Sequence, residues 1–85
     1  MDLWIRSQDG QDLWKANVIT IQDYLKTKAV DIVVSSGMEQ IKKFATYKTK
    51  EKALKVIDEI QKFINHWGAD QVYQMPADDG VDNAN

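Results

Sequence analysis

The chain has 85 residues, no cysteine, 44% hydrophobic residues and a formal net charge of −2. This length suits one small domain, the composition is too apolar for a wholly disordered chain, and the absence of cysteine excludes disulfides and thiolate metal sites. No run approaches the roughly 20 apolar residues that a membrane-spanning helix needs, and residues 1–10 lack the pattern of a signal peptide, so we expect a cytoplasmic protein.

The first predicted element is a strand over residues 3–8. Hydrophobicity alternates along it, so Leu3 and Ile5 share one face, whereas Trp4 and Arg6 share the other. This alternation predicts that one face of the strand is covered and the other is open.

A turn and a return strand follow. Asp9-Gly10 favours a two-residue type I′ turn, because both central residues of that turn need positive φ. The return strand is expected over residues 13–21, starting with Leu13 and Trp14, so that Trp4 and Trp14 face each other. Its apolar residues change from even-numbered to odd-numbered positions after Val18, which indicates a bulge, a bend or burial on both faces.

The middle of the chain is expected to continue an antiparallel meander. Residues 23–28 are polar and predict a connection, with a short helical turn at residues 23–26 as an alternative. Residues 29–35 are dense in β-branched side chains and predict a central strand. Residues 39–47 fit either a strand or a helix, and the hairpin context favours a strand. Their apolar residues at a helical interval are Ile41, Phe44 and Tyr47.

Residues 49–68 are the most strongly periodic segment and predict an amphipathic α-helix. Thr49 is placed to cap its start and Gly68 to close its end. The apolar stripe consists of Ala53, Val56, Ile57, Ile60, Phe63, Ile64 and Trp67.

The remainder predicts a short fifth strand or an extended arm over residues 71–75, which Pro76 ends. Residues 77–85 predict a disordered acidic tail. The whole order implies one small α+β domain over residues 1–76. It would hold an antiparallel meander of about four strands with the long helix packed on one face.

The chain resembles a family of small uncharacterised proteins from low-GC Gram-positive bacteria and their phages. The resemblance rests on two segments, WIRSQDG at residues 4–10 and YKTKEKALKVIDEIQKFI at residues 47–64, and on Tyr73 shortly before Met75 and Pro76. It implies a phage or prophage context and carries no activity.

The residues offer little for catalysis, so we expect neither an enzyme nor a cofactor. His66 is the single histidine and falls at the predicted helix end, so no metal cluster or Ser-His-Asp arrangement is expected. Asp58 and Glu59 are adjacent and diverge by about 100° on a helix, so they form no facing acid pair.

One candidate binding surface is the first hairpin. If the helix covers Leu3 and Ile5, then Trp4, Arg6 and Trp14 lie on the open face, a composition typical of interface hot spots. The opposite arrangement, with the tryptophans in the core, is equally compatible with the pattern. An open sheet face on so small a domain favours self-association, most simply as a homodimer.

The other candidate is a lysine cluster over residues 42–55 with Phe44 and Tyr47 interleaved. Lysines beside aromatic rings suit a nucleic-acid backbone and its bases, although solvated surface lysines are the simpler interpretation. The cluster comprises Lys42, Lys43, Lys48, Lys50, Lys52 and Lys55.

These surfaces support three hypotheses. The first is a non-enzymatic interaction protein of phage or prophage type that associates through the open sheet face. The alternative is a phage regulator that binds nucleic acid through Lys42, Lys43, Lys48 and Lys50. The third is an anti-defence protein that sequesters a nucleotide signal, with Arg6 and the lysines on its phosphates.

Overall fold

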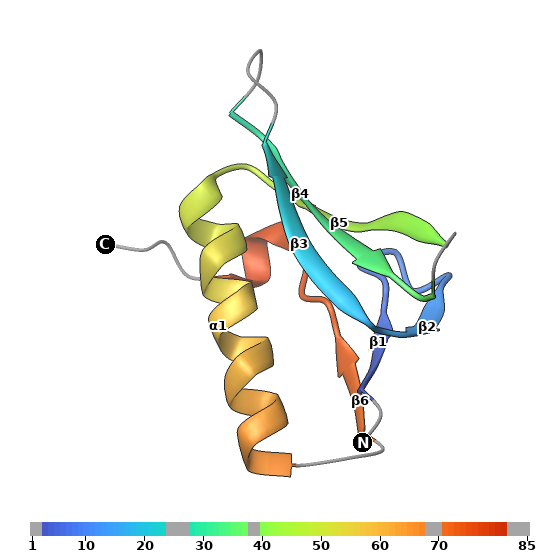
Figure 1. The fold of residues 1–85 in the computed structure, drawn as a ribbon. Helices are drawn as coiled ribbons and strands as arrows, with labels where there is room; N and C mark the ends of the chain where they lie inside the picture. The colour runs from blue at the N-terminus through green and yellow to red at the C-terminus, as the bar shows by residue number, and fades with distance from the viewer. Residues whose placement is uncertain (1–2, 24–27, 38–39, 68–70, 82–85) are drawn as a thin grey trace.

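The computed structural model describes residues 3–23, 28–37, 40–67 and 71–81, without the side chains of residues 67 and 71, and confirms an α+β fold (Figure 1). Its long helix lies beside two three-stranded sheets with strand orders β2-β1-β6 and β3-β4-β5. The elements are β1 (Leu3–Arg6), β2 (Leu13–Lys15), β3 (Val18–Asp23), β4 (Val30–Ser35), β5 (Ile41–Tyr47), α1 (Lys50–Trp67), β6 (Gln71–Gln74) and the 3₁₀ helix η1 (Asp78–Gly80).

The sheet β3-β4-β5 is antiparallel and forms the predicted meander around a central strand. Val30, Ile32 and Val34 of β4 alternate along one face and are all buried in the main core. Their β-branched side chains fill a pleated surface well, which explains why this strand was predictable from composition. The helix packs across this sheet and contacts all three of its strands.

A bulge in β5 explains its ambiguous sequence pattern. The pairing of β4 with β5 skips Phe44, since Lys43 and Ala45 oppose successive residues of β4. The extra residue turns the chain so that Phe44 and Ala45 are both buried. Phe44 thereby reaches the other sheet, where its ring meets Trp14 edge-on with centroids 5.3 Å apart. The preference for a strand over residues 39–47 is confirmed from Ile41 onward.

The predicted return strand over residues 13–21 is divided into β2 and β3, which belong to different sheets. The N–H of Ala16 donates to the carbonyl of Leu3 in one sheet, and the N–H of Asn17 donates to the carbonyl of Ser35 in the other, both at 2.8 Å. The chain therefore bends at Ala16 and Asn17, slightly before the change of apolar parity.

The predicted fifth strand is present as β6 and pairs with β1 in parallel, opposing Leu3 to Gln71 and Arg6 to Gln74. Parallel neighbours need a long crossover connection, which the chain between them supplies. This sheet is therefore mixed rather than part of the antiparallel meander. Met75 directly follows β6 and is 1% exposed, so the strand also anchors a core residue.

The prediction of a two-residue Asp9-Gly10 turn is wrong. The N–H of Ser7 donates to the carbonyl of Asp12 at 2.8 Å, so residues 8–11 form a longer loop. The hydroxyl of Ser7 donates to Oδ1 of Asp9 at 2.6 Å, and the N–H of Gln11 donates to the same oxygen at 3.0 Å. These side-chain bonds replace the tight turn, although Gly10 does have the expected positive φ of 78°.

The helix begins as predicted. Oγ1 of Thr49 accepts a hydrogen bond from the N–H of Lys52 at 3.2 Å, which is the expected N-cap. The stripe buries Ala53, Val56 and Ile60 completely or nearly so, whereas Ile64 is 37% exposed at its margin. Three predictions concern residues outside the described part of the chain. They are the closing residue Gly68, the alternative helical turn at residues 23–26, of which only Asp23 is described, and the disorder of residues 82–85.

The prediction of disorder from residue 77 onward is wrong for residues 77–81. Residues 78–80 form η1, and Val81 is only 6% exposed within the core. The carboxylate of Asp78 accepts a hydrogen bond from the N–H of Lys48 at 2.9 Å, just before the helix. One buried valine and one carboxylate at a helix start thus offset the cost of ordering a short polar segment.

Candidate interaction surfaces

The outer face of the sheet β2-β1-β6 is assembled from residues that oppose each other in register. Trp4 lies opposite Lys15 on one side and Val72 on the other. Opposed residues point to the same face of a sheet, so these strands place six side chains together. We call this surface the open face; its members are Trp4, Arg6, Leu13, Lys15, Val72 and Gln74.

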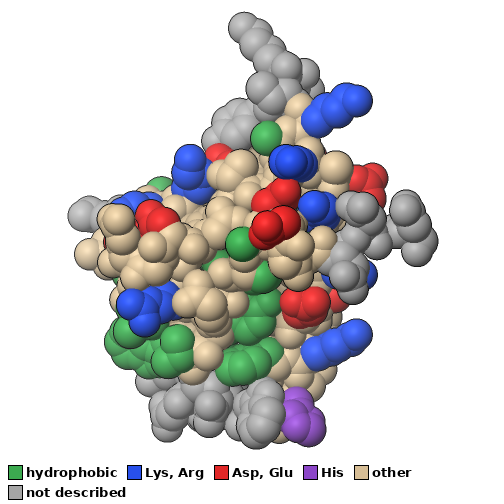
Figure 2. Space-filling model, turned by 180° about the vertical axis from the view of Figure 1, so that it is seen from behind, with side chains coloured by type: hydrophobic (Ala, Val, Ile, Leu, Met, Phe, Trp, Pro, Cys, Tyr) green, Lys and Arg blue, Asp and Glu red, His purple; other side chains and the backbone are tan. Residues whose placement is uncertain are grey.

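The open face exposes three large apolar side chains. Trp4 is 36% exposed, Leu13 49% and Val72 52%, whereas Ile5 on the opposite face of β1 is completely buried. Figure 2 shows hydrophobic side chains gathered over the lower part of the molecule with a basic side chain beside them. The two charged members of the face, Arg6 and Lys15, are both basic.

The prediction that Trp14 shares this face is wrong. Trp14 pairs with Ile5 and therefore points inward, where its ring meets Phe44 edge-on and packs against the core. The structure brings Trp4 and Arg6 together, as predicted, but not Trp14. In a hairpin whose loop is centred between Asp9 and Gly10, Trp4 opposes Lys15 and Arg6 opposes Leu13. The position of Asp9-Gly10 in the sequence could therefore have predicted that Leu13 and Lys15, which the sequence analysis missed, share the face of Trp4.

A groove of about 330 Å³ lies between β3 and α1. Leu54 is 46% exposed in it, and Ile57 is half-buried. Lys50 Nζ lies 3.3 Å from Asp23 Oδ2 in its wall. We call it the β3–α1 groove; its lining residues are Ile19, Thr20, Ile21, Asp23, Lys50, Leu54 and Ile57. Sequence reasoning missed this surface because it depends on how α1 lies across the sheet.

The lysine cluster is partly neutralised by acidic neighbours. The Nζ atoms of three of its members lie within 3.5 Å of carboxylates, in the pairs Lys42–Asp12, Lys50–Asp23 and Lys52–Asp78. Lys42 and Lys43 belong to the first half of β5, whereas the other four follow its last residue. The cluster is therefore divided between the two ends of one strand.

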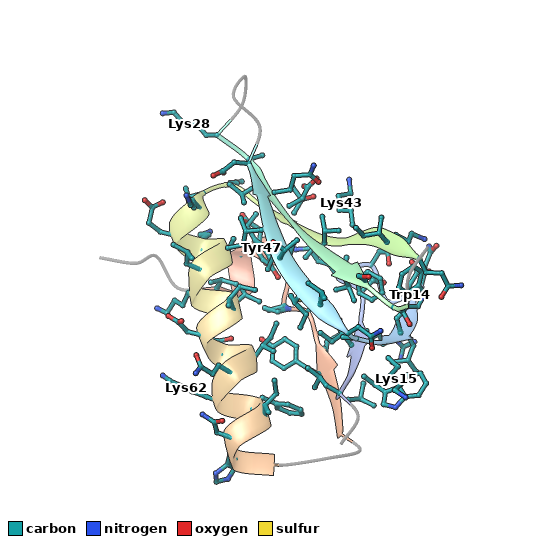
Figure 3. All side chains as sticks on the ribbon, viewed as in Figure 1. Trp14, Lys15, Lys28, Lys43, Tyr47 and Lys62 are labelled. Atoms are coloured by element: carbon teal, nitrogen blue, oxygen red, sulfur yellow. The ribbon has the colours of Figure 1, made fainter. Side chains whose placement is uncertain are left out.

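The aromatic residues predicted to interleave with these lysines are not available for base stacking. Phe44 is 2% exposed and Tyr47 is 1% exposed. Figure 3 shows Tyr47 between α1 and the sheet, whereas Lys43 points away from it. This removes the aromatic half of the nucleic-acid hypothesis, because stacking needs an accessible ring face.

A smaller cavity of about 260 Å³ lies between the β1–β2 loop and β5. Three of its four charged lining residues are bonded within the protein: Lys42 pairs with Asp12, and Asp9 accepts from the Ser7 hydroxyl and the Gln11 N–H. These hydrogen bonds, that of Ser7 first, hold the pKa of Asp9 below its usual value. The Lys42–Asp12 pair holds the β1–β2 loop against β5.

The described residues hold little that resembles a catalytic or metal centre. They contain no group of three or more His, Cys, Asp or Glu side chains placed to share a metal ion. His66 lies in the last turn of α1, and Glu59 accepts a hydrogen bond from the Tyr73 hydroxyl at 3.3 Å on the surface. Within the same part of the chain, no helix is long and apolar enough to cross a membrane.

No protein-family model, curated protein or solved structure matches this chain. The fold and its surfaces define a small α+β domain with one apolar, cationic sheet face and one apolar groove beside an edge strand. Any functional assignment therefore rests on those two surfaces.

Proposed function

We propose that this chain is a non-enzymatic interaction protein that binds a partner protein through the open face. The observation that carries the proposal is the exposure of Trp4, Leu13 and Val72 on the same face of three neighbouring strands. Single exposed apolar residues are ordinary on protein surfaces, but several on one face, beside charged residues, are typical of a docking site.

The composition of the open face suits binding energetically. Trp and Arg are the residues most enriched among interface hot spots, and here Trp4 and Arg6 are neighbours on one face of β1. Nε of Arg6 donates to the carbonyl of Gly10 at 3.0 Å, which holds part of this side chain in place before a partner arrives. Such preorganisation lowers the entropy lost on binding.

The charge of the open face indicates the chemistry of the partner. Its two charged members, Arg6 and Lys15, favour a partner surface whose rim is acidic. A face-to-face homodimer would bring two copies of Arg6 to the same interface, and like charges oppose such pairing. We therefore assign the open face to a different protein rather than to a second copy of this chain.

Residues 4–10 and 47–64 resemble a family of small proteins from Gram-positive bacteria and their phages, and this resemblance supports a phage or prophage context. On this proposal the partner belongs to the bacterial cytoplasm, from either the host or the phage. The proposal does not include catalysis or a cofactor.

Affinity capture from a Gram-positive host lysate, with identification by mass spectrometry, tests the proposal when it is followed by titration of the purified partner. We expect Trp4→Ala to weaken binding about 30-fold or more, the loss typical of a central aromatic anchor. Ile41→Ala is the matched control, because Ile41 is 67% exposed but lies on β5 of the other sheet. A partner bound equally well by both variants would contradict the assignment of the open face.

A further inference from the structure

The described edge strands differ in how they are protected from pairing with another chain. An edge presents unpaired N–H and C=O groups, which proteins usually guard with charges, bulges, short strands or a covering element. β5 carries Lys42, Lys43 and a bulge, and β2 is three residues long and ends at Lys15. β6 is flanked by α1, where the ring of Tyr73 meets Phe63 at 5.4 Å.

β3 lacks these protections. It is six residues long, contains no proline, glycine or lysine, and places its one charged residue, Asp23, at the very end. Val18 at its start is 56% exposed. In Figure 1, β3 lies in front of β4 and β5, and no other described element covers its outer edge. This edge is therefore a template for one more strand.

The β3–α1 groove adds side-chain recognition to this backbone template. Ile19 and Ile21 point from β3 toward α1 and are half-buried, and Leu54 forms the exposed apolar wall beside them. A strand added to β3 would direct its own inward side chains into this groove. Main-chain hydrogen bonds would then supply affinity, and the groove would select apolar residues at alternate positions.

We propose that the strand that completes this edge is β3 of a second copy of the chain, paired antiparallel about a twofold axis at Thr20. In this register Thr20 opposes itself and Ile19 opposes Ile21 of the second copy, so the apolar side chains of both copies lie on the helix-covered face. Each isoleucine pair then closes over Leu54. The two antiparallel sheets become one continuous sheet.

The alternative axis at Ile21 is disfavoured. It would oppose Asp23 to Ile19 of the second copy on the helix-covered face, and a carboxylate among isoleucines is costly to bury. With the axis at Thr20, Asp23 stays outside the five paired residues 18–22 and keeps its ion pair with Lys50.

Charge also favours a second copy at this edge. The surface around β3 and the adjacent side of α1 carries three acidic and two basic residues, so its net charge is small and two copies can meet with little like-charge repulsion. Its charged residues are Asp23, Lys50, Glu51, Lys55 and Asp58. The open face lacks this mixture of signs, because its charged strand residues, Arg6 and Lys15, are both basic. The two surfaces therefore suit different occupants.

Charge-swap variants at the axis test the proposal. Sedimentation of the wild-type chain should give about twice the monomer mass of 9.8 kDa. Thr20→Lys and Thr20→Glu should each give the monomer mass, because each variant opposes its own charge across the axis. An equimolar mixture should restore the dimer. Ile41→Lys, the same kind of change on the edge strand β5, should remain dimeric.

A wild-type monomer at millimolar concentration, a dimeric Thr20→Lys variant, or a mixture that stays monomeric would each overturn the proposal. The monomer result is also the outcome expected if the edge instead receives a peptide of another protein. Amide exchange gives a second readout, since protection along β3 should rise with protein concentration. Trp4→Ala should leave the dimer intact, which separates this result from the test of the open face.

Discussion

Tyr47 links three distant parts of the chain through one carbonyl. Its hydroxyl donates to the carbonyl of Pro76 at 2.7 Å, and Nε2 of Gln8 donates to the same oxygen at 3.1 Å. Gln8 also bonds the backbone of Thr46 in both directions. A polar junction of this kind is stable because every buried donor and acceptor in it is satisfied.

We predict that Tyr47→Phe lowers the free energy of unfolding by about 1–2 kcal/mol, because it removes a buried hydrogen bond and leaves Pro76 with one donor. Urea denaturation measures this change. Tyr73→Phe is the matched control: the bond of its hydroxyl to Glu59 is exposed, so its cost should stay within about 0.5 kcal/mol. Equal losses from both variants would show that the junction contributes little.

The open face shows what residue patterns could and could not predict. Alternation along β1 correctly separated Ile5 from Trp4 and Arg6, because a strand has a strict period of two. The place of Trp14 depended on cross-strand register, which alternation within either strand does not contain. Val72 could not be predicted as a member, since it arrives through a parallel pairing with a strand far away in the sequence.

Among the elements, α1 and β4 were predictable because their signals are local: an N-cap and a 3.6-residue stripe for the helix, and dense β-branched residues for the strand. β5 was ambiguous because the bulge buries Phe44 next to Ala45, so its buried residues do not follow the strict alternation of a regular strand. The order of residues 77–81 had no local signal, since it depends on Val81 reaching the core and Asp78 reaching the start of α1.

We predict that a chain ending after Pro76 is less stable by about 2–4 kcal/mol than the whole chain, from the lost burial of Val81 and the lost bonds of Asp78. A chain ending after Val81 is the control and should unfold at the same denaturant concentration as the whole chain. Thermal or urea denaturation of the two truncated chains makes the comparison. Equal stability of the two truncated chains would show that residues 77–81 contribute no stability, as expected of a disordered tail.

For the whole molecule, the ionisable groups define a pH range of stability. The N–H of Lys48 first, and then the ammonium of Lys52, hold the pKa of Asp78 below its usual value. Burial first raises the pKa of Tyr47 and of Tyr73, and the charge and hydrogen bond of Glu59 add to the effect at Tyr73. The folded chain thus favours ionised Asp78 and neutral tyrosines.

The signs follow from proton linkage. Near pH 4 the unfolded chain binds more protons at Asp78 than the folded chain, so stability should fall as the pH drops below about 4. Above about pH 10 the unfolded chain releases tyrosine protons that the folded chain retains, so stability should fall again. Unfolding free energies measured across this range test both limbs.

Variants assign each limb to its groups. Asp78→Asn should make the acid limb shallower and leave the part that comes from Asp9, and Tyr47→Phe combined with Tyr73→Phe should flatten the alkaline limb. Lys62→Gln, on the exposed side of α1, is a control that should leave both slopes unchanged. If the slopes of unfolding free energy against pH do not change in these variants, the protons that affect stability bind to other residues.

The parallel pairing of β6 with β1 has a consequence for synthesis on the ribosome. Nε2 of Gln74 donates to the carbonyl of Ser7 at 2.9 Å, a residue 67 positions earlier, and Met75 completes the core beside Ile5. While residues 71–75 are still in the exit tunnel, the first strands have emerged without the neighbour that covers them. The nascent chain should therefore expose its apolar β1 segment until residues 71–75 have left the exit tunnel, and folding should follow as a late, single event.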